Sequence, residues 1–489
     1  MKKITIILTV ITAILFSCKD TFQETVIDAN GAKAIDVTDG NNSTKYKVRG
    51  DNKFDVLGFA FDATGGYLDQ METILPVIDV DALKANTGLV ISDDAVHSSL
   101  VIEAGSDAKT LLLKYNRKFS AGGAIPIAGV PFTGSLNGEI NEDRTIGSKY
   151  SYAMANMNCY ISHHSIKEYT DISILQNYLT QSFKDDLLTK TPEQIVTLYG
   201  THVYTDIYTG GSLRFKYKSN IKNNTKEGSV AYATKIGAGA STGINMSVSS
   251  STILVTTETT AYQLQNMEYA SVGGSGGTSV LGSWTPGDGG VPSINFNQWS
   301  STINKSNPNS LQLIDIGDNS LMAIYEFVAD PAKKAALKVA VDNHILSKSF
   351  EVVPVVPLYM YENSSTKNHH YTTNWDELGK ENGNWKYQKI AAFVCASQST
   401  NTVPLYRFYR VYKVLFGKSY YNHYFTTNYQ SGTSAYNFEW IQCYVYASKS
   451  PGTIKLYQYW NSSTHDHYYT TTQGVLPGYG SETTCCYVY

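Results

Sequence analysis

The chain is organised around the stretch Tyr199-Gly200-Thr201-His202-Val203, which is followed six residues later by the pair Gly210-Gly211. A helical pattern ends at the first glycine, and a strand pattern begins directly after the histidine. Glycine ends helices well because it tolerates a left-handed backbone conformation, and glycine inside a strand often marks a bulge. Taken alone, the stretch predicts a helix C-terminus followed by a strand with a glycine bulge.

The same residues resemble the signature of the membrane attack complex/perforin (MACPF) family, which reads Tyr/Trp-Gly-Thr/Ser-His-Phe/Tyr-x6-Gly-Gly. Only Val203 departs from it, since the family usually has an aromatic residue there. The run from Phe54 to Asp62 also resembles the opening strand of bacterial MACPF domains. The resemblance covers about residues 50–350 and implies an α+β fold, in which a bent antiparallel sheet like that of the cholesterol-dependent cytolysins is flanked by helical clusters.

Length and charge limit the classes of protein to which the chain can belong. A chain of 489 residues is too long for one ordinary core, so two or three domains are expected. The net charge of −3 offers no basic excess for binding nucleic acid. We expect a signal peptide over residues 1–18, a flexible tether over 19–50, a MACPF domain over 51–350 and a Tyr-rich β domain over 351–489.

The N-terminus carries a targeting signal. Lys2-Lys3 precede an apolar run from Ile4 to Phe16, which is short for a membrane-spanning helix and has the flanks of a signal peptide. The run leads into Leu15-Phe16-Ser17-Cys18, which resembles a bacterial lipobox. This resemblance implies an outer-membrane lipoprotein acylated on Cys18, at the cell surface or released in vesicles or by secretion. The alternative is an ordinary secretory signal with an incidental cysteine.

The remaining cysteines form no recognisable framework. Their number is odd, and neither a CxxC motif nor the Cys/His spacing of a zinc site is present. No nucleophile–base pair, carboxylate constellation or phosphate-binding loop stands out. We therefore expect no disulfide framework, no metal, no cofactor and no enzymatic activity. The disulfide pairing stays open for Cys159, Cys395, Cys443, Cys485 and Cys486.

Periodicity and capping residues predict the helices around the signature. Apolar residues at three- and four-residue steps predict one helix over residues 169–189. Thr191-Pro192-Glu193-Gln194 has the residues of a capping box and begins a second helix, which ends at Gly200. His202 has no partner acid or nucleophile in the pattern, so we expect a buried histidine bonded to backbone groups and no catalytic role.

Other elements follow from alternation and from Pro, Gly and Asp positions. Strands are expected over residues 54–62, in short runs within 100–115, and over 130–140, 151–165, 211–221 and 256–272. Asp330-Pro331 caps a last helix to about Lys348, and Pro354 and Pro357 then predict a linker.

The segment from Val230 to Val248 holds a period of two over nineteen residues. A membrane β-strand needs only about nine to eleven residues with an apolar outward face, so a hairpin made from this segment would cross a bilayer twice. The same Gly- and Ala-rich residues could also pack as small helices, as a surface hairpin or as a linker. The outward-facing set comprises Val230, Tyr232, Ile236, Ala238, Ala240, Ile244, Met246 and Val248.

The family resemblance implies a mechanism for these segments. Monomers would assemble side by side into a ring, and residues 137–152 and 222–251 would unfurl into two amphipathic hairpins per subunit. Gly273-Gly274 would be the hinge at the base of the sheet. The first segment is crowded with charges that must face the lumen or lie at the hairpin tip, and this departure puts lysis in doubt. These charges are Glu139, Glu142, Asp143, Arg144 and Lys149.

The last quarter of the chain contains 21 of the 37 tyrosines and three copies of one pattern. Leucine-tyrosine strands alternate with His-Tyr-Thr-Thr strands, whose histidine positions are His369, His423 and His467. Short aromatic strands in triplicate predict a β-trefoil-like domain. The repeated aromatic residues are interpreted as core, and loop residues are the better candidates for binding a glycan. These candidates are Asn363, Ser364, Ser365, Asn461, Ser462 and Ser463.

Two functions remain open. The first is a pore-forming antibacterial toxin, which resembles the secreted antimicrobial MACPF proteins of gut Bacteroidales. It would use its C-terminal domain to bind a glycan or a protein receptor on the target outer membrane. The second is a non-lytic surface adhesin that binds glycan on the MACPF scaffold.

Overall fold

The structure is a computed structural model of the full chain. It describes residues 23–26, 33–38, 44–48, 53–69, 72–119, 127–136, 139–140, 144–220, 264–275, 281–284, 299–413, 419–429, 435–474 and 477–489. The predicted membrane strand 230–248 and Cys18 lie outside these residues.

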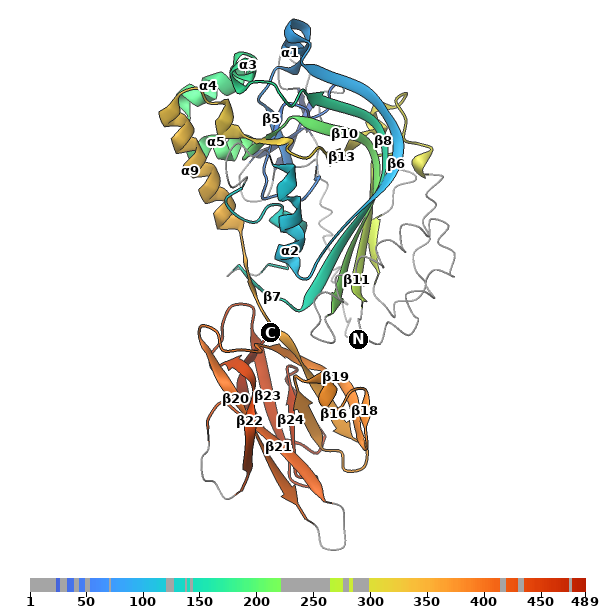
Figure 1. Ribbon diagram of the computed structural model, residues 1–489, viewed down its shortest axis with the longest axis vertical. Coiled ribbons are helices and arrows are strands. Elements are labelled where there is room, and N and C mark those ends of the chain that lie inside the picture. The colour runs from blue at the N-terminus through green and yellow to red at the C-terminus, as the bar shows by residue number, and fades with distance from the viewer. Residues whose placement is uncertain are drawn as a thin grey trace, which may run out of the picture.

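A long, bent antiparallel sheet forms the frame of the N-terminal domain (Figure 1). Its strand order is β12-β11-β10-β8-β6, and β13 pairs with β10 beyond the end of β11. The strands are β6 (Val90–Gly105), β8 (Tyr150–Ile166), β10 (Asp206–Asn220), β11 (Leu264–Val272), β12 (Leu281–Trp284) and β13 (Gln312–Ile316). The strand predicted over 151–165 is confirmed as part of β8, and the strand predicted over 211–221 is confirmed as far as Asn220, where β10 ends.

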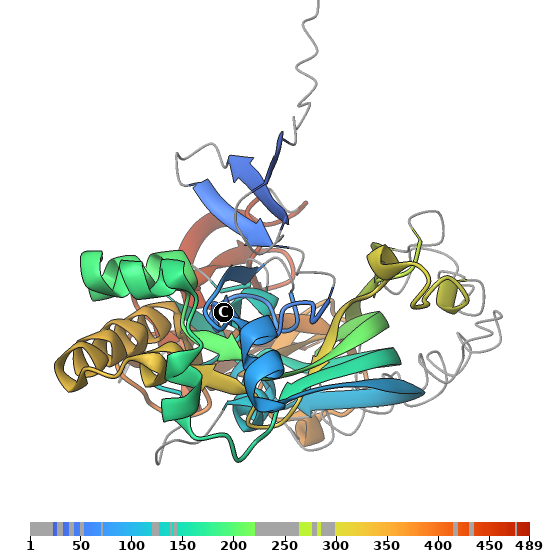
Figure 2. The ribbon, with the colours of Figure 1, turned by 90° about the horizontal axis from the view of Figure 1, so that it is seen from above.

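A smaller sheet and most of the helices lie beside the upper end of this frame. The smaller sheet has the order β14-β9-β4-β5 and consists of β4 (Phe59–Phe61), β5 (Thr73–Pro76), β9 (His202–Tyr204) and β14 (Leu321–Ala323). The α-helices are α1 (Val80–Thr87), α2 (Ala108–Leu113), α3 (Ile172–Asn177), α4 (Gln181–Thr189), α5 (Pro192–Tyr199) and α9 (Pro331–Lys348). Figure 2 shows α3, α4, α5 and α9 on the side opposite the long strands. The 3₁₀ helices are η2 (Lys114–Lys118), η3 (Thr133–Leu136), η6 (Pro308–Ser310), η7 (Ile324–Phe327) and η8 (Trp375–Glu377).

Local capping explains why two of the predicted helices are confirmed. Thr191 and Gln194 form the expected capping box at the start of α5, with Pro192 in its first turn. The Asp330 side chain accepts hydrogen bonds from Ala332 N and Lys333 N at 2.8 and 2.9 Å, and so begins α9.

The single helix predicted over 169–189 is wrong, because it is two helices. The first helix ends at Asn177, and two residues later Leu179 forms a β-bridge with Ile78. Thr180 then caps α4 by accepting a hydrogen bond from Phe183 N. The apolar spacing continues across the break, and therefore the pattern alone did not reveal it.

Two predicted strand regions are also wrong, the first only in part. Within residues 100–115, expected as short strand runs, residues 100–105 do belong to β6. The rest is helical: Asp107 caps α2, and η2 follows directly after it. Residues 130–140 contain η3 and no strand among the residues described there, and Phe132 has a positive φ of 54°. Its ring packs edge-on to Tyr115 in the core, with centroids 5.9 Å apart. The alternation in this segment thus reflects burial of an irregular chain. The strand expected over 54–62 shortens to β4, because residues 55–58 form turns.

The predicted tether holds three short strands, β1 (Gln23–Val26), β2 (Lys33–Thr38) and β3 (Thr44–Val48). They pair antiparallel in the order β1-β2-β3 and appear as a separate blue sheet in Figure 2. This stretch is therefore not irregular throughout.

Below the bent sheet, the C-terminal domain consists of three units that are each built on three antiparallel strands (Figure 1). In each unit the first strand lies between the other two. The units are β16 (Val356–Asn363), β17 (His369–Thr372) and β19 (Trp385–Val394), with the short β18 (Glu381–Asn382); β20 (Thr402–Tyr412), β21 (Tyr420–Thr426) and β22 (Asn437–Tyr446); and β23 (Ile454–Asn461), β24 (Asp466–Thr470) and β25 (Gly480–Val488).

The ends of the third strands close the three units into a ring. Cys395 pairs with Tyr444, and Tyr446 pairs with Tyr487. The last residue, Tyr489, then exchanges two backbone hydrogen bonds of 2.9 Å with Phe393 of the first unit. Each unit therefore contributes the same segment of its third strand to the same kind of contact with the next unit.

Candidate functional site

The signature residues lie in the core where α5 meets the smaller sheet. Gly200 has φ 74° and ψ −143°, and a Cβ atom there would come within 2.7 Å of the Phe61 backbone, so only glycine fits. The Thr201 hydroxyl accepts a hydrogen bond from Ala63 N at 2.9 Å. Tyr199 is fully buried, and its hydroxyl donates to Asp186 at 2.9 Å. These contacts fix the end of α5 against β4 and against α4.

His202 is a core residue. It is 2% exposed, its Nδ1 lies 2.9 Å from Thr201 Oγ1, and its ring packs edge-on to Phe119 with centroids 4.8 Å apart. Burial lowers the pKa of His202 to about 3, so the ring is neutral near pH 7. The expected buried position is thus observed, although the polar partner is a threonine side chain rather than the backbone.

The two glycine pairs, 63 residues apart in the sequence, come together at the bend of the sheet. A Cβ atom on Gly210 would overlap the carbonyl oxygen of Cys159 on β8. A Cβ atom on Gly273 would come within 2.6 Å of the Gly210 carbonyl oxygen. Backbones therefore approach here more closely than any side chain allows.

Trp299 completes this junction. Its indole N–H donates to Gly273 O at 3.1 Å, and a Cβ atom on Gly274 would come within 2.7 Å of the same nitrogen. Gly274 N donates to Ser310 O at 2.8 Å. Gly273 and Gly274 have φ values of 76° and 78°, which reverse the chain after β11. The sequence indicated each glycine pair separately, but nothing in it showed that the two pairs lie in contact.

The strands β6, β8, β10 and β11 all have an end on one side of the sheet. We call this row of strand ends the lower edge; it is distinct from the outermost strands of the sheet. The register pairs Gly105 with Tyr152, Tyr150 with Asn220, and Ser219 with Leu264. The chain between β6 and β8 (residues 106–149) and the chain between β10 and β11 (residues 221–263) therefore leave from the same edge. In Figure 1 this edge faces the C-terminal domain.

Part of the first of these connections is tied to the sheet by Glu139. Its carboxylate accepts a 2.5 Å hydrogen bond from the Tyr152 hydroxyl and lies 3.2 Å from Lys218 Nζ. Burial and the Glu139 charge raise the pKa of Tyr152 well above its usual value. Lys216 donates to Ser135 O at 2.7 Å, which adds a second tie to the same strand.

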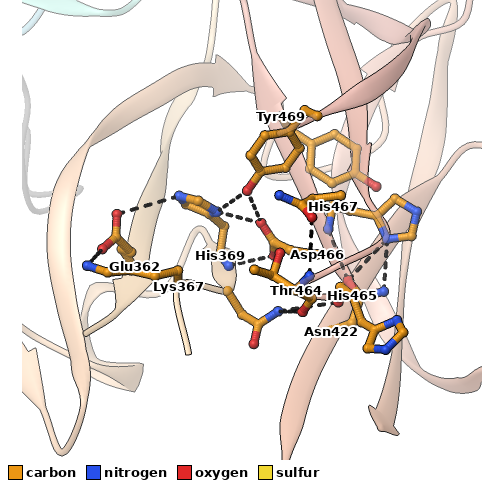
Figure 3. A network of polar contacts seen from close by, with 12 residues as sticks. Glu362, Lys367, His369, Asn422, Thr464, His465, Asp466, His467 and Tyr469 are labelled. Atoms are coloured by element: carbon orange, nitrogen blue, oxygen red, sulfur yellow. Dashed lines mark hydrogen bonds and ion pairs between the residues drawn. The ribbon is translucent and has the colours of Figure 1, made fainter. Parts of the chain in front are cut away.

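The C-terminal domain contains a network of polar contacts between its units (Figure 3). The buried carboxylate of Asp466 accepts hydrogen bonds from His369 N and from the Tyr479 hydroxyl, and lies 2.7 Å from His369 Nδ1. Asn422 is placed in the same way against His467, whose backbone N–H donates to Asn422 Oδ1 at 3.2 Å. These contacts join the third unit to the first, and the second unit to the third.

A different cluster joins the first and second units. Arg407 is 3% exposed; its Nη2 lies 3.1 Å from Glu377 and its Nε donates to Glu439 at 2.6 Å. The guanidinium carbon lies 4.0 Å from the ring centroid of Trp440. Arg407 occupies the position of Met360 and Gln458 in the other units, so this ion cluster breaks the repeat.

The predicted glycan-binding residues include two structural asparagines. Asn363 Oδ1 accepts from Ser365 N and Thr366 N, and Asn461 Oδ1 accepts from Ser463 N and Thr464 N. Both therefore hold equivalent turns between the first and second strands of their units. Ser364 and Ser462 are exposed in these turns.

The cysteines carry no cross-link in the part of the chain that is described. Cys159, Cys395, Cys443, Cys485 and Cys486 are all free thiols. Among the same residues, no group of three His, Cys, Asp or Glu side chains is placed to hold a metal ion. No helix within the described ranges has the length and hydropathy needed to cross a membrane.

Comparisons with known proteins assign the N-terminal domain. The model of the MAC/Perforin domain family matches residues 81–349, which is more than half of the chain. A second model, described as a domain of unknown function (DUF5648), matches residues 339–430. The search of curated proteins gives no match.

Several solved structures are similar to this one. A MAC/Perforin-domain protein from Bacteroides thetaiotaomicron is 17% identical, with 65% of this chain and 66% of that chain covered and a TM-score of 0.46. GNIP1Aa from Chromobacterium piscinae is 13% identical, with 89% and 81% covered and a TM-score of 0.45. Listeriolysin O is 9% identical, with 74% and 58% covered and a TM-score of 0.23. On the family match, this chain belongs to the MAC/Perforin domain family, a family of pore-forming proteins.

Proposed function

We propose that the protein forms membrane pores by extending two pairs of strands of its bent sheet into a bilayer. The observation that supports this proposal is the position of two connections, residues 106–149 and 221–263. Both start and end at the lower edge, and each joins two strands that already pair with each other. Each connection could therefore become a hairpin that continues its own ladder without any change in strand order. The two hairpins would lie side by side, because β8 and β10 are neighbours.

The lengths of the two connections are sufficient. From 106 to 149 there are 44 residues, and from 221 to 263 there are 43. A membrane β-strand needs about nine to eleven residues, so each connection supplies two strands and a turn. We therefore extend the first proposed segment from 137–152, which covers only the end of the connection and the start of β8, to the whole connection.

Insertion requires several copies of the chain. An isolated hairpin leaves unpaired backbone groups at its edges, and lipid offers them no partner. A closed barrel pairs all of these groups. We therefore propose that copies associate into a ring through the outermost strands of their sheets. Gly210, Gly273 and Trp299 would form the bend that opens as the sheet flattens.

We further propose that the C-terminal domain binds the target. It lies at the edge from which both connections leave (Figure 1). A receptor held there would bring that edge to a membrane. The target would be the outer membrane of a related bacterium, and the bound group a glycan or an outer-membrane protein. Acylation at Cys18, export to the cell surface, a β-trefoil-like C-terminal fold and the lack of enzymatic activity belong to the same proposal.

The test is dye release from outer-membrane vesicles of susceptible cells, with charge substitutions that share one segment. Ile236→Asp would place a charge toward lipid, at a cost of about 2–4 kcal/mol in mid-bilayer, and is expected to abolish release. Ser241→Asp would place the same charge toward the lumen and is expected to retain it. Equal release by both variants would contradict the proposed strands.

The alternative function is a non-lytic adhesin that binds glycan. The contacts of Glu139 with Tyr152 and Lys218 favour it, because they hold part of the first connection on the sheet. This function predicts glycan binding with no dye release from any vesicle that carries the glycan.

A further inference from the structure

We infer that the strand joining the two domains, β15 (Glu351–Val353), holds the first connection closed until the C-terminal domain moves; this inference rests on the pore-forming function proposed above. The contact partner is β7 (Thr145–Gly147), the last part of the connection before β8. Release of the first hairpin would thus be coupled to receptor docking.

The contact is a parallel ladder extended on both sides. Glu351, Val352 and Val353 pair with Thr145, Ile146 and Gly147. Before the ladder, Glu351 N donates to Arg144 O at 2.9 Å, and the Arg144 side chain donates to Lys348 O at 2.6 Å.

Beyond the ladder, the contact continues into the C-terminal domain. Ser148 N donates to Val353 O, and Val355 N donates to the Ser148 hydroxyl, both at 3.0 Å. Ser148 is 2% exposed, so these bonds are shielded from water. Residues 144–148 cannot become part of a hairpin while they are bonded to β15. The backbone groups that make these bonds would be needed for the new strand pairs.

Alternating side chains fix β15 to both domains at once. Phe350 and Val352 pack into the core of the N-terminal domain. Val353 and Val355 pack instead with Phe393, Tyr446 and Tyr489, at the closure of the three-unit ring. Since successive residues of a strand point to opposite faces, a movement of the C-terminal domain must shift the strand that pairs with β7.

The last residue of the chain makes a second contact with the same segment. A Cβ atom on Gly147 would come within 3.1 Å of the Tyr489 ring, so the ring lies directly against the Gly147 backbone. Tyr489 is also the residue that closes the ring of three units through Phe393. A change at the closure of the three-unit ring would therefore reach β7 directly through Tyr489.

The experiment locks the ladder with a reversible cross-link. In Ile146→Cys/Val352→Cys the two positions face each other in the register, and Thr145→Cys/Glu351→Cys provides a second pair if the first fails to fold. The matched control is Glu381→Cys/Lys386→Cys, which cross-links register partners inside the C-terminal domain and leaves β15 free.

Oxidation of a ladder pair is expected to lower the rate of dye release from susceptible vesicles at least tenfold, and reduction to restore it. The control pair is expected to release dye equally in both states. Equal release by the oxidised and reduced ladder pairs, with wild-type protein active, would overturn the inference and leave the pore proposal standing.

Hydrogen exchange separates the two proposals. If the wild type releases no dye from any vesicle, the pore proposal fails. The ladder is then judged by the backbone amides of Thr145–Gly147 and Glu351–Val353 in protein docked on the vesicles. Joint loss of protection on docking supports the coupling, and retained protection in the docked protein contradicts it.

Discussion

At the scale of single residues, several glycines and His202 have structural roles that depend on their neighbours in the fold. Gly200, Gly210 and Gly273 are required because another backbone occupies the space of a Cβ atom. His202 is required as a neutral ring that fills the core beside Phe119.

Substitution at the bend tests the close approach of the backbones. Gly210→Ala is expected to lower the stability of the N-terminal domain by about 2–4 kcal/mol, since the methyl group would overlap Cys159 O and strain the strand pair. Thermal unfolding followed by circular dichroism measures this loss. Gly480→Ala is the control, because nothing lies within 4 Å of its Cβ position. A loss equal to that of the control would contradict the packing described at the bend.

Buried histidines set the direction of the pH dependence. Burial, followed by the charges of His163 and Lys84, lowers the pKa of His164 to about 4. An unfolded histidine titrates near 6.5, so the unfolded chain binds more protons between these values, and stability falls as pH drops from about 6.5 to 4. His164→Asn should reduce this part of the slope in melting temperature against pH. An unchanged slope would show that the ring is protonated in the folded state.

At the scale of elements, the sequence predicts what local interactions determine. The capping box of α5 and Asp330 at α9 act within four residues, and both helix starts were predicted correctly. The break between α3 and α4 depends on a bridge from Leu179 to Ile78, about a hundred residues away, and was not predicted. The pairing of β15 with β7 spans a still larger separation of more than two hundred residues, and Pro354 and Pro357 indicated only a linker.

The candidate site was predictable to the same extent. The signature identified Gly200, His202 and the pair Gly210-Gly211, since their types and spacing are fixed, and the family resemblance implied the hinge Gly273-Gly274. The meeting of Gly210 with Gly273, and the ties of Glu139 to Tyr152 and Lys218, arise only when the strands pair. Tertiary pairing of this kind has no local pattern.

The repeated tyrosines provide a prediction for the C-terminal units. The hydroxyl of Tyr469 donates to Phe425 O at 3.1 Å and accepts from Phe425 N at 2.8 Å. Tyr469→Phe removes both bonds and leaves buried backbone groups unpaired, so a loss of about 2 kcal/mol in the free energy of unfolding is expected. The Tyr457 hydroxyl, in the described bonds, contacts only the exposed Gln473. Tyr457→Phe should therefore lower the free energy of unfolding by under about 0.5 kcal/mol. Chemical denaturation compares the two.

At the scale of the whole molecule, the coupling that we propose between recognition and opening runs through one set of contacts. The C-terminal domain, the linker strand β15 and the end of the first connection form one continuous set of contacts. The second connection leaves the sheet beside the first. Under the proposal above, a movement of the C-terminal domain would free β7, and with it the first connection.

The most direct measurement is a cysteine scan of residues 230–248 with an environment-sensitive dye, on protein mixed with susceptible vesicles. Labels at Ile236, Ala238, Ala240 and Ile244 should shift to lipid-like emission, and labels at Gly237, Gly239, Ser241 and Gly243 should remain water-like. Dye release without this alternation, or with every label remaining in water, would contradict the insertion of this segment as a membrane strand.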